Sequence, residues 1–543
     1  MSKKHLGLIV ALCSVVALAM PVFGAGGDEE SSALPAGPLL PWTGEEVVFE
    51  GFGADLGMED DPGMPVVQAY RKLTGNVRID WDTVPWNDYD TKLNLYLQSG
   101  DMPDIVWARD VVGKTAMFSA TGVLLDWDKY QDRMPNYQRW TEEHTFVNNV
   151  LTTTGERYAI VDITNAEYMG EGWFYNPSIL AKAGITSPPE TMEELLDDMI
   201  AVKKAAPDAD GFLEQWGMGR VLGAFGNALN AKRDMAYDQN AKKWIYGPTM
   251  DPNYRKLIEY LREGWAAGVF NLDTLGDAIV NERVQELRTQ ANYAFTYVYY
   301  SALENNIFKY DQGVDNPLKG MRTPSFEGTR NYWVTVPHDR INGWGYMASS
   351  KTKNPELLAA YVDNIVSLEV AEMYDWGVEG VTFSRTAGGG REWIGDLTTD
   401  RAKRKEAGVG NFWDPRYIHF GNYKANWFGL GMTRIGDEGR LACAEDIKAL
   451  QRGEMVARFS HQRPQMTADV NDEIGKIMTP IKTFVSEQQL KFINGDRPMS
   501  EFNDFIAQIK ELGDIDKVVR YYNEGRQFPM GERKYPDLPP DLL

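Results

Sequence analysis

The side chains that most often carry catalytic or metal chemistry are scattered in this chain, with the exception of carboxylates. No histidine belongs to HExxH or another paired metal-binding spacing. The chain also lacks a G-x-S-x-G nucleophile elbow, a Walker loop and a dinucleotide fingerprint after a strand. The chain has 78 acidic residues. A pair of carboxylates that catalyses glycoside hydrolysis therefore remains an alternative, because two such acids can come from any part of a sequence. The five histidines are His5, His144, His338, His419 and His461.

Aromatic side chains are abundant and gather in short strand-like runs. They make up 12% of the chain, with 16 Trp and 26 Tyr. Because alternate residues of a strand point to opposite faces, Trp173 and Tyr175 share one face of their run. Trp344 shares a face with Tyr346 in the same way, and Tyr299 lies at the carboxyl end of a third run. Rigid rings suit ligand contact, since little entropy is lost when they bind, and burial in the core is the alternative.

The elements that would position these side chains are clearest around residues 89 to 110. Apolar residues from Tyr89 to Leu97, spaced three and four apart, predict an amphipathic helix. Gly100 would end this helix, and Pro103 would prevent its continuation. The apolar run 105–107 then predicts a buried parallel strand.

Two further strand candidates, 47–50 and 77–81, precede this helix and strand. Together they predict a doubly wound α/β lobe. Ligands of such sheets lie at the carboxyl ends of the strands, so Trp107, Arg109 and Asp110 are the first candidates for ligand contact.

Length, charge and cysteine content set the class of protein. A chain of 543 residues predicts two or three domains. Without residues 1–24, which contain two lysines and no acids, 54 basic residues face 78 acidic ones, a net charge of −24. Such a chain repels phosphate backbones and anionic lipids, which argues against nucleic-acid and membrane-surface partners. Only Cys443 would remain after loss of Cys13, so no intramolecular disulfide is expected.

The amino end has the features of a secretory signal peptide. Lys3 and Lys4 precede an apolar run and a small-residue site at Gly24. The run is too short for a membrane span, and Pro21 interrupts it. Cys13 lies in the middle of the run after Leu12, which disfavours lipid anchoring. We therefore expect a free periplasmic or secreted form, with 25–44 as a flexible tether.

Four stretches in order resemble family 1 extracellular solute-binding proteins, the capture subunits of sugar ABC importers. The first is Gly100-Asp101 with Pro103-Asp104, similar to the family's sGD-x-PD signature. The others resemble its large oligosaccharide- and alginate-binding subgroup, and the similarity spans about residues 47–528. These other stretches are 351–356, 376–381 and 491–513.

This resemblance implies a two-lobe periplasmic-binding-protein fold of type II, with a doubly wound sheet flanked by helices in each lobe and a hinge between them. Crossovers are expected near 155–165, 280–290 and 320–340. The expected segments are 45–160 and 287–335 for the N-lobe, 161–286 and 336–528 for the C-lobe, and 529–543 for a tail.

The resemblance also implies a carbohydrate, and within that class an oligosaccharide, bound between the lobes. Aromatic rings would cover the apolar faces of the sugar, and polar side chains would pair with its hydroxyls. The residues expected to bind this ligand are Trp107, Asp110, Trp173, Tyr175, Tyr299, Trp344, Glu379, Arg385 and Trp427.

Large relatives often carry a calcium loop where this chain has residues 206–215. Asp208, Asp210 and Glu214 keep three carboxylates, and Phe212 would offer its carbonyl. Ala206 replaces an aspartate and Gln215 a glutamate, which weakens the site. An acidic surface loop is therefore favoured over structural calcium, and no other cofactor is expected.

A binding protein of this family acts without turnover, as a monomer, and passes its ligand to a membrane permease. A secreted glycoside-active enzyme and a solute sensor for a membrane receptor are the alternatives. The sequence leaves the identity, length and linkage of the sugar open.

Overall fold

The computed structural model describes most of the chain between residues 37 and 527. Contacts divide the chain into Met1–Pro38 and Leu39–Leu543, and all elements below belong to the latter unit. The described residues are 37–55, 62–143, 145–164, 171–214, 217–270, 286–287, 290–299, 317–326, 331–333, 340–386, 391–398, 401–409, 437–457, 461 and 463–527.

A five-stranded sheet forms the centre of what we call the first lobe. Its strands are β1 (Trp42–Asp55), β2 (Gly75–Pro85), β3 (Ile105–Arg109), β4 (Ile160–Thr164) and β12 (Arg340–Ala348). They are arranged in the order β2-β1-β3-β12-β4. β1 is parallel to β2 and to β3, whereas β12 is antiparallel to β3 and β4. The sheet is thus mixed.

The helix and strand predicted around residue 100 are confirmed. Helix α2 spans Trp86–Ser99, and Gly100 caps it with φ 68° and ψ 13°, a left-handed conformation that glycine adopts without strain. Leu93 and Leu97 are buried in the lobe. All residues of β3 except Arg109 are buried, as expected for a central strand.

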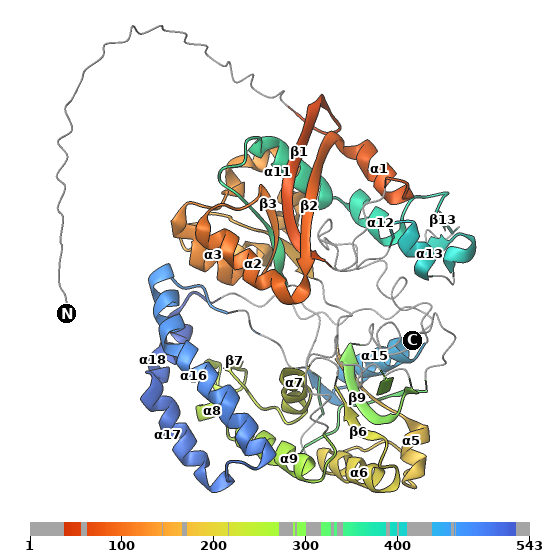
Figure 1. The fold of residues 1–543 in the computed structure, drawn as a ribbon, viewed down its shortest axis with the longest axis vertical. Helices are drawn as coiled ribbons and strands as arrows, with labels where there is room; N and C mark the ends of the chain where they lie inside the picture. Colours follow the sequence, from red (N-terminus) through yellow and green to blue (C-terminus); the bar gives the residue numbers. More distant parts are fainter. Residues whose placement is uncertain are drawn as a thin grey trace, which may run out of the picture. The chain divides into compact units, whose positions relative to one another are not determined.

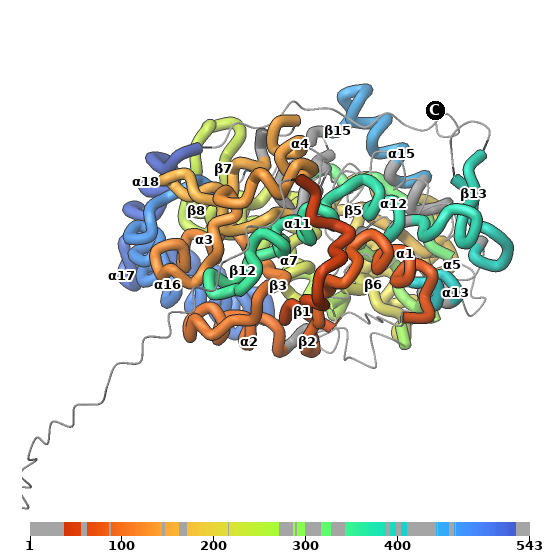
Figure 2. Tube along the Cα trace, turned by 90° about the horizontal axis from the view of Figure 1, so that it is seen from above, coloured from red at the N-terminus to blue at the C-terminus, as the bar shows by residue number. Residues whose placement is uncertain are grey.

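Helices cover this sheet, and two of them come from much later in the chain. Figure 1 shows α2 and α3 beside the strands, with α11 near the upper end of β1. The helix α1 lies against α12, and both views show them side by side (Figures 1 and 2). Arg133 ties η2 to α11 through an ion pair with Glu356 of 2.8 Å. The elements are α1 (Pro65–Thr74), α3 (Val111–Phe118), η1 (Ser119–Thr121), η2 (Trp127–Arg133), α4 (Pro135–Glu143), η3 (Thr145–Val150), α11 (Pro355–Ile365) and α12 (Leu368–Trp376).

A four-stranded sheet organises the second lobe. It contains β5 (Glu171–Tyr175), β6 (Asp210–Leu213), β9 (Tyr293–Tyr299) and β10 (Lys319–Met321), in the order β10-β5-β9-β6. β5 is antiparallel to β9 and β10, and β6 is parallel to β9.

One hydrophobic core joins this second sheet to helices from the middle and the end of the chain. The helix α16 runs for 27 residues and packs against α9, α17 and α18. The helices of this lobe are α5 (Pro177–Lys182), α6 (Met192–Ala205), α7 (Met218–Ala228), α8 (Gly247–Met250), α9 (Pro252–Ala266), α15 (Asp437–Gln451), α16 (Ala468–Asn494), α17 (Phe502–Leu512) and α18 (Ile515–Glu524). The remaining elements are the pairs β7–β8 (Met235–Asp238, Lys243–Tyr246), β11–β15 (Asn331–Trp333, Met455–Ala457) and β13–β14 (Phe383–Arg385, Arg391–Trp393), with η8 (Gly395–Thr398), η9 (Met499–Glu501) and α13 (Arg401–Glu406).

Two predicted segment assignments are wrong. The segment 287–335 was expected in the N-lobe, but its strand β9 pairs with β5 and β6 of the second sheet. The segment 336–528 was expected in the C-lobe, but its strand β12 lies between β3 and β4. Residues 293–298 of β9 and 344–348 of β12 are buried on both faces, so alternation in the sequence does not indicate which sheet each strand joins.

The place of β12 depends on a glycine. A side chain at Gly345 would bring its Cβ within 2.3 Å of the carbonyl oxygen of Ile160 on β4. The close pairing of Gly345 with Val161 is therefore possible only without a side chain.

A buried carboxylate joins α11 to α4 and makes stability depend on pH. Asp363 accepts hydrogen bonds from the backbone N–H of Tyr137 at 2.8 Å and of Asn136 at 3.2 Å. Burial raises the pKa of Asp363 from 3.8 to about 6. The folded chain therefore holds this proton more tightly, and the free energy of unfolding contributed by Asp363 decreases as pH rises from about 4 to 6.

Urea unfolding at pH 4, 5, 6 and 7 checks this dependence. The Asp363→Asn variant should lose this part of the pH dependence, because asparagine does not titrate. An unchanged slope in the variant would show that other groups cause it.

None of the helices in the described residues combines the length and apolar character that a membrane span requires.

Candidate ligand-binding site

Two of the predicted aromatic residues meet at the first sheet, but they cover each other. Trp107 on β3 and Trp344 on β12 stack with ring centroids 4.4 Å apart and an interplanar angle of 21°. They are only 4% and 8% exposed. Tyr89 of α2 covers Trp107 further by donating a hydrogen bond to its carbonyl oxygen. The structure therefore brings the two indoles together as a buried pair with little free surface.

The charged side chain beside this stack, Arg109, already has partners within the protein. The guanidinium of Arg109 lies 6.0 Å from the ring centroid of Trp344, within range of a cation–π interaction. Its Nη2 forms an ion pair of 2.6 Å with Asp90 of α2. Arg109 thus fixes the end of β3 against α2.

The next residue, Asp110, has a strained backbone and opens α3. Its φ of 54° and ψ of 47° are left-handed, which Asp tolerates better than most residues. One carboxylate oxygen accepts a hydrogen bond from the N–H of Gly113 at 3.3 Å, so Asp110 is also the N-cap of α3. Strain of this kind is common at functional sites.

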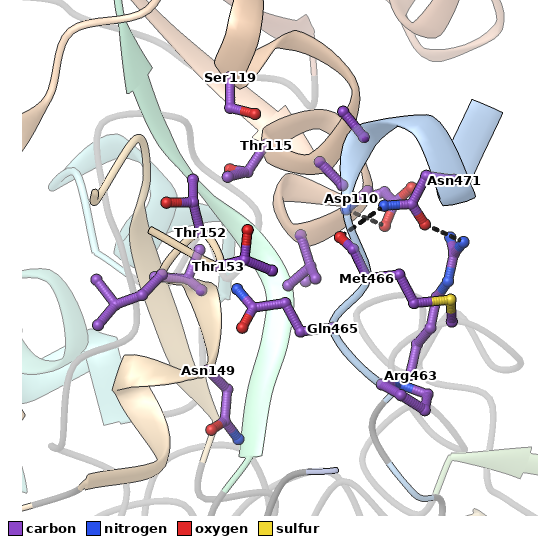
Figure 3. Close-up of a pocket in the computed structure, with 18 of the residues that line it drawn as sticks. Asp110, Thr115, Ser119, Asn149, Thr152, Thr153, Arg463, Gln465, Met466 and Asn471 are labelled. Carbon is purple, nitrogen blue, oxygen red and sulfur yellow. Dashed lines mark hydrogen bonds between the residues drawn. The ribbon is translucent and has the colours of Figure 1, made fainter. Parts of the chain in front are cut away.

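Asp110 lines a cavity of about 270 Å³ (Figure 3). The walls come from both lobes. The first lobe contributes α3, η3 with the turn after it, and β12, and the second lobe contributes the segment 461–471. Most of the polar groups that line it are hydroxyls and amides. These are Thr115, Ser119, Asn149, Thr152, Thr153, Gln465 and Asn471.

Thr115 is the most deeply buried of the hydroxyl-bearing residues in this wall. It is 3% exposed, and its buried Oγ1 has no hydrogen-bond partner among the described residues. A buried hydroxyl without a partner costs stability.

On the opposite wall, an arginine is held in place by its neighbours. Arg463 donates from Nη2 to Oδ1 of Asn471 at 2.7 Å, and its guanidinium lies 5.5 Å from the ring centroid of Tyr522. Asn471 in turn donates to the carbonyl of Met466 at 3.1 Å. Figure 3 shows Arg463 bonded to one end of the Asn471 amide and the Met466 carbonyl bonded to the other.

The expectation that Trp173 faces a cleft is wrong. Trp173 is 1% exposed and lies in the core of the second lobe. Its ring centroid is 5.3 to 5.7 Å from those of Tyr297, Phe225 and Phe212. Tyr175 shares this face, as the alternation predicts, and packs at the edge of the same core.

Glu379 and Arg385 pair with each other away from the cavity. The Nε of Arg385 lies 3.0 Å from Glu379, and its Nη2 lies 2.8 Å from Glu372 of α12. Arg391 of the neighbouring strand joins Glu372 as well. This network holds the β13–β14 hairpin on α12. It pairs the charged groups of both predicted ligand residues, Glu379 and Arg385.

The structure does not describe the side chains of the two remaining predicted ligand residues. Trp427 lies outside the described residues, and Tyr299 ends β9 without a described side chain.

The structure describes residues 206–214 of the loop compared with a calcium site. Asp208 is exposed, whereas Asp210 and Glu214 are buried, and no cluster of three acidic, His or Cys side chains suited to a metal occurs in the described part of the chain. The carbonyl of Pro207 accepts from Lys203 Nζ at 2.9 Å, and that of Asp208 accepts from Asn292 at 2.8 Å. The side chain of Phe212 is in the core. Protein donors thus occupy the carbonyls of Pro207 and Asp208.

The cavity contains residues that the sequence did not single out, among them Thr115, Asn149, Arg463 and Asn471. Thr115 follows soon after the carboxyl end of β3, where ligands of such sheets bind, so the sequence could have indicated it. The segment 461–471 has no such signal, because only the tertiary structure brings it to α3.

Two α/β lobes built from alternating segments, with a cavity between α3 and the segment before α16, are the architecture of a two-lobe binding protein. The chain belongs to the bacterial extracellular solute-binding protein family, whose model matches residues 60–372, more than half of its length. Proteins of this class bind without catalysing a reaction.

Two curated relatives are sugar-binding proteins. The chain is 22% identical over 419 residues to the polygalacturonan/rhamnogalacturonan-binding protein YtcQ of Bacillus subtilis, covering 73% of this chain and 79% of that one. It is 23% identical over 396 residues to the fructooligosaccharide ABC transporter substrate-binding protein FusA of Streptococcus pneumoniae, covering 66% and 69%.

Solved structures show the same fold. The alginate-binding protein AlgQ2, in a crystal structure without calcium ion, matches with a TM-score of 0.70 and 16% identity, over 89% of this chain and 98% of that one. FusA of S. pneumoniae in complex with kestose matches with a TM-score of 0.65 and 17% identity, over 88% and 99%.

Proposed function

We propose that this protein is exported, captures an oligosaccharide between its two lobes and delivers it to the permease of an ABC importer. The observation that carries the proposal is the cavity at the carboxyl end of β3, whose lining comes from both lobes and combines a larger apolar surface with hydroxyl and amide side chains. Such groups exchange hydrogen bonds with sugar hydroxyls, and a site shared by two lobes couples binding to hinge closure.

The relatives support this class of ligand. Polygalacturonan, rhamnogalacturonan and fructooligosaccharides, which the names of the two curated relatives specify, are all carbohydrate chains. We propose that the mature protein starts near residue 25, acts as a monomer and is free in the periplasm or outside the cell.

We also propose that the loop 206–210 needs no calcium. Lys203 places a cationic ammonium at this loop through its bond to the Pro207 carbonyl. Chelation of divalent metals is then expected to leave this loop intact.

A thermal-shift screen of the purified protein against neutral and acidic oligosaccharides tests the function. A ligand at 100 times its dissociation constant stabilises the fold by about 2.7 kcal/mol, so one oligosaccharide should raise the midpoint clearly. The sugar must be recovered uncleaved. A series without any response would overturn the proposed ligand class, and a lower midpoint in EDTA would overturn the proposal for the loop.

A further inference from the structure

We infer that the guanidinium of Arg233 binds a carboxylate of the ligand, so that the preferred oligosaccharide contains a uronic acid. This inference rests on the proposed function and names the chemical class of its ligand. Arg233 lies between α7 and β7, and its side chain is exposed. Tyr237 of β7 stacks on His461, a residue that lines the cavity beside α3, with ring centroids 3.8 Å apart. Arg233 precedes Tyr237 by four residues, at most about 14 Å of chain, so it belongs to the same region of the second lobe.

Arg233 lies near the edge of the second sheet where ligands of such sheets bind. β6 and β9 are parallel, so their carboxyl ends meet at one edge. Tyr299 ends β9 at this edge and pairs with Glu171, the first residue of β5. The helix α7 follows β6 in the chain, and its Arg220 forms an ion pair with Glu171. The first turn of α7 is thereby held at this edge.

Three glycines of α7 form a flat seat for the Arg233 side chain. Gly219, Gly223 and Gly226 are four and three residues apart, so they share one face of the helix. Nη1 of Arg233 donates to the carbonyl oxygen of Gly219 at 3.1 Å. A Cβ at Gly223 would lie 3.7 to 4.0 Å from the guanidinium, and a Cβ at Gly226 would lie 3.0 Å from Cδ of Arg233. Glycine inside a helix costs stability relative to alanine, and here it lets the arginine lie flat along α7.

Most of the hydrogen-bonding capacity of the Arg233 guanidinium is available to a ligand. A guanidinium has five N–H donors, and the helix carbonyl named above is its one acceptor among the described residues. The acids closest to it in the chain and across the sheet are engaged elsewhere. Glu171 pairs with Arg220, and Asp234 pairs with Lys482 at 3.4 Å. Within the described part of the chain, no carboxylate forms an ion pair with Arg233.

The surroundings of Arg233 strengthen its attraction for an anion. Surrounding protein lowers the pKa of the guanidinium from its ordinary value by desolvation, and the charge of Glu171 works against that shift. The side chain is nevertheless exposed, a combination expected for a group in a recess of the surface. Charge-assisted hydrogen bonds are stronger in such a place than in bulk water.

The local balance of charge favours a carboxylate over a hydroxyl. Three cations, Arg220, Arg233 and Lys482, face two acids, Glu171 and Asp234, which leaves one positive charge in excess. A carboxylate neutralises this excess, and its two oxygens match the planar fork of a guanidinium. A uronic acid supplies such a group on a sugar ring.

Uronic-acid trimers and their carboxyl-reduced counterparts test the choice of ligand. Reduction turns each carboxylate into a neutral CH2OH group and keeps the linkage, so trimers of galacturonate, guluronate and mannuronate give matched pairs. In titration calorimetry at low salt, the wild type should bind one acidic trimer about tenfold or more tightly than its reduced counterpart. Added salt should narrow this preference, because it screens an exposed pair of charges.

Arg233→Gln is the decisive variant, with Arg255→Gln as its matched control. Arg255 is an exposed arginine of α9 in the same lobe, and its Nε pairs with Glu259 at 2.8 Å. Both variants lose one positive charge, so they change the net charge equally. Arg233→Gln should bind the acidic trimer about ten- to a hundredfold more weakly, as for a lost hydrogen bond between charged groups, and the reduced trimer almost normally. Arg233→Lys should fall between, because lysine keeps the charge without the fork.

The outcomes separate this inference from the proposed function. Equal affinity of Arg233→Gln and Arg255→Gln for the acidic trimer, or an equal loss for both sugars in Arg233→Gln, would overturn the inference. A wild type that binds neutral sugars in preference to acidic ones would overturn it as well, while the proposed function stands. If neither the trimers nor any sugar of the thermal-shift screen binds, the proposed function itself is overturned.

Discussion

Replacement of Arg157 by methionine is expected to lower the free energy of unfolding by about 3–5 kcal/mol, the usual cost of removing one partner of a buried ion pair. Arg157 is 4% exposed. It donates to Asp128 and Asn148 at 2.7 Å each and to the hydroxyl of Tyr137 at 3.2 Å. Three neighbouring elements, η2, α4 and η3, therefore lose a common anchor, and Asp128 keeps a partly buried charge without its partner.

Urea unfolding with Arg157→Lys and with the double variant Asp128→Asn/Arg157→Met identifies the cause. Lysine keeps the charge but does not reach all three acceptors in the same geometry, so its loss should be intermediate. The double variant should recover part of the stability, because it removes the uncompensated carboxylate. A loss below about 1 kcal/mol for Arg157→Met would show that the cluster is not a stabilising anchor.

The second large effect is expected for Trp173→Ala, which should cost about 3–5 kcal/mol, as for other buried Trp and Phe residues. The indole fills the space between Phe212, Phe225 and Tyr297 in the second lobe. It does not line the described cavity. The folded fraction of the variant should therefore bind the ligand with unchanged affinity.

Trp173→Phe is the control for shape and polarity. The phenyl ring keeps much of the packing, and the change removes an indole N–H that has no hydrogen-bond partner among the described residues. We expect a clearly smaller loss than for alanine, measured by urea unfolding and calorimetry on the same samples. If Trp173→Phe retained full stability but lost ligand affinity, Trp173 would be a ligand contact after all, and its assignment to the core would be incomplete.

Local signals in the sequence were sufficient for the elements around residue 100. The spacing of Tyr89, Leu93 and Leu97 defines the buried face of α2, and Gly100 and Pro103 separate it from β3. These signals act within a few residues, so they do not depend on the rest of the fold.

Pairing between strands that are distant in the sequence could not be predicted in this way. β9 has the apolar pattern of any central strand, and its place in the second sheet depends on contacts with β5 and β6. The residues of the site differ in the same way. Asp110 could be predicted, because it comes directly after a buried strand, whereas Arg463 reaches the same cavity through the packing of α16 on α3, which the sequence does not reveal.

The aromatic predictions show a further limit. The alternation in β12 correctly places Trp344 and Tyr346 on one face, but it does not say whether another ring covers that face. Trp107 covers Trp344 in the structure, and this stack forms only when β3 and β12 lie side by side.

The position of β12 between β3 and β4 also affects the order of events during biosynthesis. A ribosome makes β5, β6 and β9 before it reaches Arg340, yet β12 is the one described strand with which β4 pairs. Domains usually fold as units as they emerge, amino-terminal one first. Here the amino-terminal sheet must wait for a strand that is synthesised after most of its neighbour, so a nascent chain shorter than about 340 residues has β4 without a strand partner. The first lobe is consequently completed late in translation or after it.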